Sequence, residues 1–120
     1  MSLTDRELLE LAAKAAGKGP ILSIEGGQVI LGPRSALRIW SPLDDDGDAL
    51  RLAVQLGMSL RLAQFEEWTQ VFVDDLYSRA AKPVTEHAGR TQKGQTIEQA
   101  TRRAIVRAAA EIGKAMRERV

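Results

Sequence analysis

The stretch from Trp40 to Gly57 constrains the fold of this chain more than any other part of it. A short β-like run over 36–40 leads into Pro42, which ends the strand because proline has no N–H to donate to a β-ladder. Four aspartates crowd the next residues, and apolar residues at helical spacing follow without a linker. The chain must turn directly from a strand into a helix here, so its fold combines both kinds of element.

The aspartates of this corner raise the question of a metal site; they are Asp44, Asp45, Asp46 and Asp48. They do not match the calcium-loop template, because its first and last ligand positions would fall on a proline and an alanine. A helix start explains them better, since its free N–H groups and positive dipole end favour carboxylates. We expect Asp46 to be the N-cap and Asp48 to lie in the first turn, which leaves the four aspartates as weak metal candidates.

Helical and extended patterns alternate along the rest of the chain. Apolar residues at helical spacing predict helices over 4–16, 46–56 and 97–117, the first and last of which begin at capping boxes. The central helix is apolar on so many sides that we expect it to be largely buried. Short apolar and β-branched runs predict strands over 21–24, 28–31, 36–40, 59–65, 69–76 and 84–87. These patterns indicate an α+β fold, in which a small, mainly antiparallel sheet of about 4–6 short strands packs against N-terminal, central and C-terminal helices.

The composition describes one small domain over residues 1–120. Apolar residues make up 44% of the chain and charged residues 28%, which is ordinary for a globular protein. Because the chain has no cysteine, it has no disulfide and no thiolate metal site. No apolar run reaches the roughly 18 residues that span a bilayer, and a signal-peptide pattern is absent, so we expect a cytoplasmic protein without membrane contact. The polar stretch at about 78–95 predicts a flexible loop.

The net charge of +1 hides an asymmetry between two parts of the chain. Residues 1–78 carry 7 Lys/Arg and 12 Asp/Glu, a net charge of −5, whereas residues 79–120 carry 10 and 4, a net charge of +6. Opposite charges in a compact fold tend to lie close together, so we favour packing of the basic part against the acidic part. The alternative is a basic face that binds an acidic partner.

Four basic residues form a stripe on the predicted C-terminal helix: Arg103, Arg107, Lys114 and Arg117. Such a stripe suits nucleic-acid binding, but this helix has no aromatic residue to stack on bases. A solvated helix face, with Arg107 paired to Glu111 one turn away, is the simpler interpretation. We therefore keep nucleic-acid binding as the alternative function.

The sequence contains no clear set of catalytic residues. His87 is the only histidine, and it lies in the polar stretch without the serine or cysteine arrangement of a catalytic triad. The paired glycines at 26 and 27 lack the spacing of a phosphate-binding loop. We therefore expect a non-enzymatic protein without a cofactor.

Three segments give the chain a family resemblance. They are L-L-E-L-A-A-K-A-A-G at 8–17, the Trp40–Ala53 segment with W-S-P-L followed by D-D-G-D-A-L-R-L-A, and A-T-R-R-A-I-V-R-A-A-A-E-I-G at 100–113. The layout resembles small proteins of unknown function encoded by tailed phages and prophages, including the NinX-like group. Ser41 stands where that group usually has Asn, and the stretch from about 75 to 95 is longer. The resemblance implies a phage or prophage origin and a compact α+β fold, without implying any chemistry.

Together these observations predict an accessory protein of a phage or prophage. It would act in the bacterial cytoplasm by binding a host or phage protein or nucleic acid. A homodimer formed through the apolar faces of the helices is compatible with each of these functions.

Overall fold

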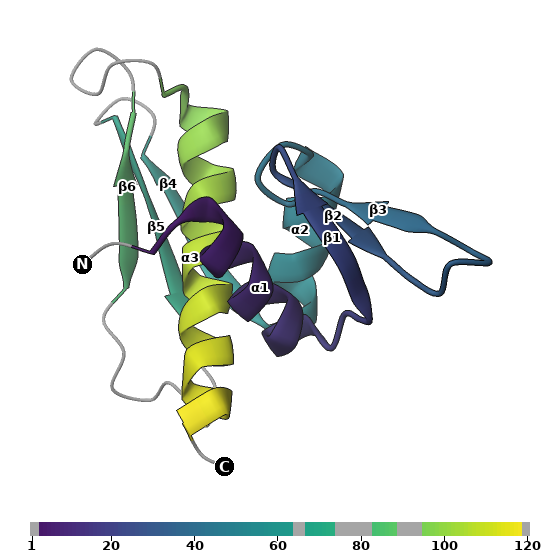
Figure 1. Ribbon diagram of the computed structural model, residues 1–120. Coiled ribbons are helices and arrows are strands. Elements are labelled where there is room, and N and C mark those ends of the chain that lie inside the picture. Colours follow the sequence, from purple (N-terminus) through teal and green to yellow (C-terminus); the bar gives the residue numbers. More distant parts are fainter. Residues whose placement is uncertain (1–2, 64–66, 74–82, 89–94, 119–120) are drawn as a thin grey trace.

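The computed structural model describes residues 3–63, 67–73, 83–88 and 95–118. The elements follow the order α1 (Asp5–Ala16), β1 (Ile21–Glu25), β2 (Gln28–Leu31), β3 (Arg38–Trp40), α2 (Asp46–Gln55), β4 (Met58–Ala63), β5 (Trp68–Val73), β6 (Val84–His87) and α3 (Ile97–Glu118). This arrangement confirms the predicted α+β class (Figure 1). The predicted strand 84–87 is also present, whereas other parts of the expected flexible loop, 78–82 and 89–94, lie outside the described residues.

The strands form two antiparallel sheets where we expected one. The first has the order β1-β2-β3 and the second the order β4-β5-β6. The helix α2 follows β3 and leads into β4, so it connects the two sheets. In the first sheet, Val29 lies opposite both Ile24 and Trp40, and the side chains of Val29 and Trp40 are buried in the core. In the second, Leu60 lies opposite Val71, which is also buried.

The C-terminal helix α3 occupies the middle of the molecule. It contacts β5 and β6 on one side and α1 and α2 on the other, with the first sheet beyond α1 and α2 (Figure 1). A helix covered on two sides must be apolar over a wide arc, and Ala104, Val106 and Ala109, which lie on different sides of α3, are all completely buried. The alanine-rich sequence of α3 therefore reflects its central position between α1, α2 and the second sheet.

The helices α1 and α3 approach each other closely at Gly113. A Cβ on this residue would overlap the Leu11 carbonyl oxygen of α1, and the Leu11 Cα would lie 3.2 Å away. Small residues allow two helix backbones to approach closely, and Ala12 and Ala109 are both completely buried. Gly113 thus sets the distance between α1 and α3.

The strand-to-helix corner forms as expected, with one correction. The N-cap of α2 is Asp45, not Asp46, because the turn after Ser41 brings the Asp45 side chain over the helix start, where it accepts a hydrogen bond from the Asp48 N–H at 2.8 Å. Asp48 lies in the first turn as predicted, and its carboxylate accepts from the Ser41 N–H at 2.9 Å. Asp48 therefore connects the residue before Pro42 to the first turn of α2.

Both predicted capping boxes are present. In α1, the Thr4 hydroxyl accepts from the Glu7 N–H and the Glu7 carboxylate accepts from the Thr4 N–H. In front of α3, Thr96 and Gln99 make the same reciprocal pair. Each box satisfies two N–H groups that a helix start otherwise leaves free.

Candidate functional site

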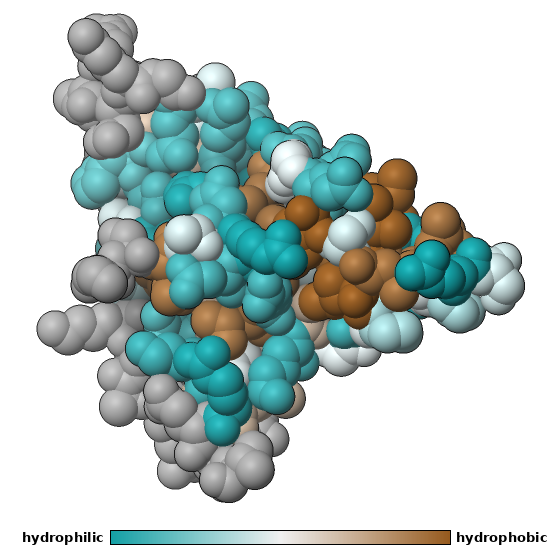
Figure 2. Space-filling model, in the orientation of Figure 1, coloured by the Kyte–Doolittle hydropathy of each residue, from teal (hydrophilic) through white to brown (hydrophobic). Residues whose placement is uncertain are grey.

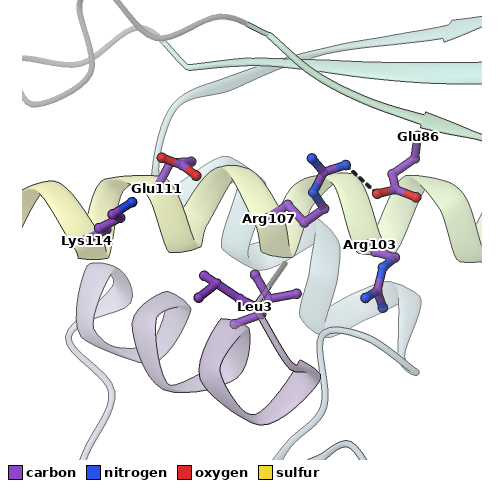
Figure 3. Close-up of a pocket in the computed structure, with 7 residues that line it drawn as sticks. Leu3, Glu86, Arg103, Arg107, Glu111 and Lys114 are labelled. Atoms are coloured by element: carbon purple, nitrogen blue, oxygen red, sulfur yellow. Dashed lines mark hydrogen bonds and ion pairs between the residues drawn. The ribbon is translucent and has the colours of Figure 1, made fainter. Parts of the chain in front are cut away.

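Three of the four basic residues selected from the sequence line one cavity. Arg103, Arg107 and Lys114 project from α3 into a space of about 500 Å³ between α1, α3 and β6. Leu3, Leu8, Glu86 and Glu111 complete its lining. Figure 3 shows, however, that Arg107 points toward Glu86 whereas Arg103 points the other way. We call this space the polar cavity.

Arg107 is held by the neighbouring strand rather than by its own helix. Its Nη1 lies 2.5 Å from a Glu86 carboxylate oxygen and donates at 3.1 Å to the Thr85 carbonyl oxygen. The Glu86 side chain is only 14% exposed and also accepts from the Gln95 amide at 3.1 Å. The expected partner Glu111 is therefore replaced by Glu86, because β6 packs beside α3 and brings a more buried carboxylate to the guanidinium.

Two further arginines of α3 are paired with the acidic part of the chain. Arg103 Nη2 lies 2.9 Å from the Asp5 carboxylate on α1. Arg102, which the sequence did not single out, lies 2.6 Å from the Asp46 carboxylate and donates to the Leu43 carbonyl oxygen at 2.9 Å. These pairs support packing of the basic part against the acidic part, the interpretation we favoured for the charge asymmetry.

The last two basic residues of the stripe are exposed. Lys114 borders the polar cavity, and Arg117 lies over a separate space of about 290 Å³ near Glu7 and Glu10. The Thr4 N–H that donates to the Glu7 carboxylate lowers the pKa of Glu7, helped by the Thr4 hydroxyl and by the positive charge of Arg117. The four residues therefore do not form one continuous cationic surface.

The aspartates of the corner separate into different contacts. Asp45 caps α2, Asp46 pairs with Arg102, and Asp48 pairs with Arg51 at 2.7 Å. Asp44 lies over the Gly26–Gly27 turn, where a Cβ on Gly27 would be 2.7 Å from its Oδ2. Within the parts of the chain that the structure describes, no three His, Cys, Asp or Glu side chains are grouped so that they could hold a metal ion.

An apolar groove on the other side of α3 was not predicted. It has a volume of about 470 Å³ and lies between α2, β4 and the first turns of α3. Its apolar lining consists of Ala49, Leu50, Leu60, Leu62, Ile97 and Ile105. Asp46, Glu98 and Arg102 supply charge at its rim. We call this space the apolar groove.

The exposed leucines of the groove follow from how the elements pack. Along β4, Met58, Leu60 and Leu62 alternate onto the face that meets the helices. Met58 and Leu60 pack against the core, but Leu62 extends past it and is 60% exposed. The strand therefore carries its apolar face beyond the helices that cover it.

The second apolar feature of this region lies on α2. Leu50 and Val54, one turn apart, are 56% and 72% exposed. Our expectation that α2 would be buried on most sides is therefore wrong, because α2 buries only the arc containing Ala49, Leu52 and Ala53. The sequence did contain a signal for these exposed residues: the apolar arc of α2 is wider than a helix can bury when it packs against neighbours on one side only.

A third group of exposed apolar residues lies on the first sheet. Ile39 lies in the edge strand β3 and is 62% exposed, and Leu37 just before this strand is also exposed. On β1, Ile21 and Leu22 are exposed. Figure 2 shows apolar side chains gathered over this sheet. Trp40, by contrast, is buried in the core, with the Lys18 ammonium 6.0 Å from its ring centre.

Comparisons with known proteins do not assign the chain to a family. No protein-family model matches it, and searches of curated proteins and of solved structures found no significant match. The resemblance to phage-encoded proteins stays a prediction. None of the helices that the structure describes is long and apolar enough to cross a membrane.

Proposed function

We propose that this protein is a non-enzymatic interaction protein that contacts another protein chain through the apolar groove. The observation that carries this proposal is the exposure of Leu50 and Leu62 on either side of a concave, mainly apolar surface. Binding sites are typically concave and apolar with a few polar groups at their edge. Contiguous apolar surface that the fold leaves uncovered is a mark of an interaction site.

The groove is a better binding surface than the polar cavity because its leucines Leu50 and Leu62 are left largely uncovered by the fold. Arg103 and Arg107 already have carboxylate partners, so a ligand would have to compete with Asp5 and Glu86. Leu50 and Leu62 gain only by being covered, at roughly 25 cal/mol for each Å² of apolar surface removed from water. A protein partner therefore gains more binding free energy at the apolar groove than at the polar cavity.

The wider role we propose is that of an accessory protein of a phage or prophage, acting in the bacterial cytoplasm. Its support is the resemblance of segments 8–17, 40–53 and 100–113 to NinX-like proteins. These segments supply much of α1, α2 and α3, and α3 contacts both other helices. The test is the gene neighbourhood: phage genes on either side support this role, and a conserved housekeeping operon contradicts it.

The binding proposal is tested by comparing captured proteins among three baits. Wild-type protein, a Leu50→Glu/Leu62→Glu double variant and an Ile39→Glu control are each presented to bacterial lysate together with a second, differently tagged copy of the chain. Because all changed residues are exposed, each bait should keep its fold, which circular dichroism checks. A protein or second copy that is retained by wild type and the control but lost from the double variant supports the proposal. Equal capture by all three baits contradicts it.

Nucleic-acid binding is the second candidate function. Three residues of the basic stripe do border one cavity, which is the observation in its favour. Since Arg103 and Arg107 are engaged with carboxylates, Lys114 and Arg117 are the residues of the stripe best placed for phosphates. Phosphate binding releases counterions, and this release sets the salt dependence of the binding constant K. If two residues contact phosphates, a plot of log K against the log of the salt concentration should have a slope no steeper than about −2. A slope near −4 would indicate about four phosphate contacts and would favour this function.

A further inference from the structure

The apolar groove lies beside an apolar ridge, and Leu50 belongs to both. The ridge is the pair Leu50 and Val54 on α2. Leu50 of α2 also lines the groove, and Leu62 of β4 with Ile97 and Glu98 of α3 line it too; we call these three residues the wall. Both features are therefore on one surface of one chain, side by side, which we call the ridge-and-groove surface.

We infer that the ridge-and-groove surface is the interface of a symmetric homodimer. This inference rests on the proposed function in one respect, that the groove is a protein contact surface, and it names a second copy of the chain as the occupant. A two-fold axis brings the same patch of two subunits together in opposite directions. The ridge of each copy then enters the groove of the other, and both ridges are covered at once.

The edges of this surface carry charges of both signs. Arg51 is 73% exposed and lies on the side of the ridge away from the groove, where it contacts Asp45 and Asp48. Glu98 lies on the wall at the opposite edge of the surface. When the ridge of one copy enters the groove of the other, Arg51 comes to face the partner wall and its Glu98. Arg51 contacts Asp45 and Asp48 through Nη2, and a guanidinium has five N–H donors in all, so it can add this contact without losing the others. Symmetry produces this opposite-charge contact twice.

The overall charge also permits two copies to associate. The net charge is +1, so self-repulsion between copies is small. The rim of the groove carries both signs, with the Asp46–Arg102 pair already neutralised at 2.6 Å. An opposite-charge rim around an apolar centre is the usual anatomy of a protein interface.

Sedimentation equilibrium of the full chain from about 1 to about 300 µM tests this inference. We expect the wild type to form dimers within this range. Leu50→Glu and Leu62→Glu should each weaken dimerisation at least about tenfold, because each puts a charge into the covered apolar centre. Ile39→Glu makes the same change at a site of similar exposure on the first sheet, so it should leave dimerisation unchanged.

A double-mutant cycle on Arg51→Ala and Glu98→Ala tests the predicted orientation. Each single change should weaken the dimer several-fold. The double variant should dimerise little more weakly than either single variant, because each single change already removes the contact between the two side chains. Independent effects would show that these residues do not meet, and would overturn the ridge-into-groove orientation.

Two outcomes overturn the homodimer. One is a wild type that stays monomeric up to about 300 µM. The other is a dimer that Ile39→Glu disrupts and Leu50→Glu does not, which would place the contact on the first sheet. If the wild type is monomeric but a different captured protein depends on Leu50 and Leu62, the homodimer is wrong and the proposed function survives. If no capture depends on these residues either, both are wrong.

Discussion

The polar cavity and the apolar groove lie on different faces of the same helix, α3, and differ in how far the fold satisfies their side chains. In the cavity, Arg107 and Arg103 each have a carboxylate partner from another element. In the groove, Leu50 and Leu62 are more than half exposed. A charged cluster that looks functional can therefore be structural, whereas a surface of ordinary leucines can be the part that the fold leaves for a partner.

One of the two largest effects should come from the helix crossing beside the polar cavity. Gly113→Ala places a Cβ against the Leu11 backbone, which has no flexible side-chain end to give way. Ala is usually better than Gly in a helix by about 1 kcal/mol, but overlap here should reverse the sign and lower the free energy of unfolding by about 3 kcal/mol. Urea unfolding measures this loss.

Gly47→Ala is the matched control for that change. Its Cβ would be 3.2 Å from the ends of the Arg51 and Asp45 side chains, which can move. Its unfolding free energy should change by no more than about 0.5 kcal/mol. If both glycine variants are equally stable, Gly113 does not set the distance between α1 and α3, and the wall of the polar cavity is looser than its contacts indicate.

The second comparison separates folding from binding within α2. Leu52 is 2% exposed and Leu50 faces the groove. Leu52→Ala should lower the free energy of unfolding by roughly 2–5 kcal/mol because it leaves a cavity in the core. Leu50→Ala should change the unfolding free energy by less than about 0.5 kcal/mol in the monomer at low concentration. A large loss from Leu50→Ala would mean that this leucine serves the fold, and would weaken the case for the groove.

The elements were predictable because their signals are local. Capping boxes at Thr4 and Thr96, the proline that ends β3 and the glycines of the first hairpin depend on neighbours within a few residues. The error at Asp45 is of the same local kind: a turn of one residue more or less decides which aspartate reaches the helix start.

The partners of charged residues were not predictable for the same reason. Arg107 pairs with Glu86, 21 residues away along the chain, and Arg102 pairs with Asp46, 56 residues away. Such contacts depend on which layer of the fold covers each face of α3. Predicting the groove requires the same knowledge of the packing, since Leu50 and Leu62 belong to separate elements that meet only in the folded chain.

A smaller effect should distinguish the two arginines of the polar cavity. Arg107→Met removes the cation beside Glu86, which is largely buried, and should lower the free energy of unfolding by about 1 kcal/mol after allowance for solvent screening. Arg103→Met removes a partner of the exposed Asp5 and should lower it by less than about 0.5 kcal/mol. Urea unfolding at low and high salt measures both, with the larger loss decreasing as salt is added. Equal losses would show that burial of Glu86 does not strengthen its pair.

The smallest effect uses the two capping boxes, one beside each region. Glu7 in α1 borders the space under Arg117, and Gln99 lies in the first turn of α3, next to Glu98 on the groove wall. Because the pKa of Glu7 is lowered in the folded chain, its contribution to stability is complete above the pKa of the unfolded chain and is lost as the pH falls through the folded pKa. Glu7→Gln keeps an acceptor for the Thr4 N–H but cannot ionise. It should therefore reduce the loss of stability on acidification from about pH 7 to about pH 3.

Gln99→Glu is the reciprocal test. The Gln99 Oε1 accepts from the Thr96 N–H at 2.8 Å, the same contact that Glu7 makes with Thr4. A carboxylate there gains the same N–H donor and the same helix dipole, so its pKa should be lowered and the loss of stability on acidification should increase. Urea unfolding at both pH values measures the two variants against the wild type. If Glu7→Gln reduces the loss but Gln99→Glu does not increase it, the positive charge of Arg117 rather than the capping contact lowers the pKa of Glu7, and the difference between the two regions extends to their helix starts.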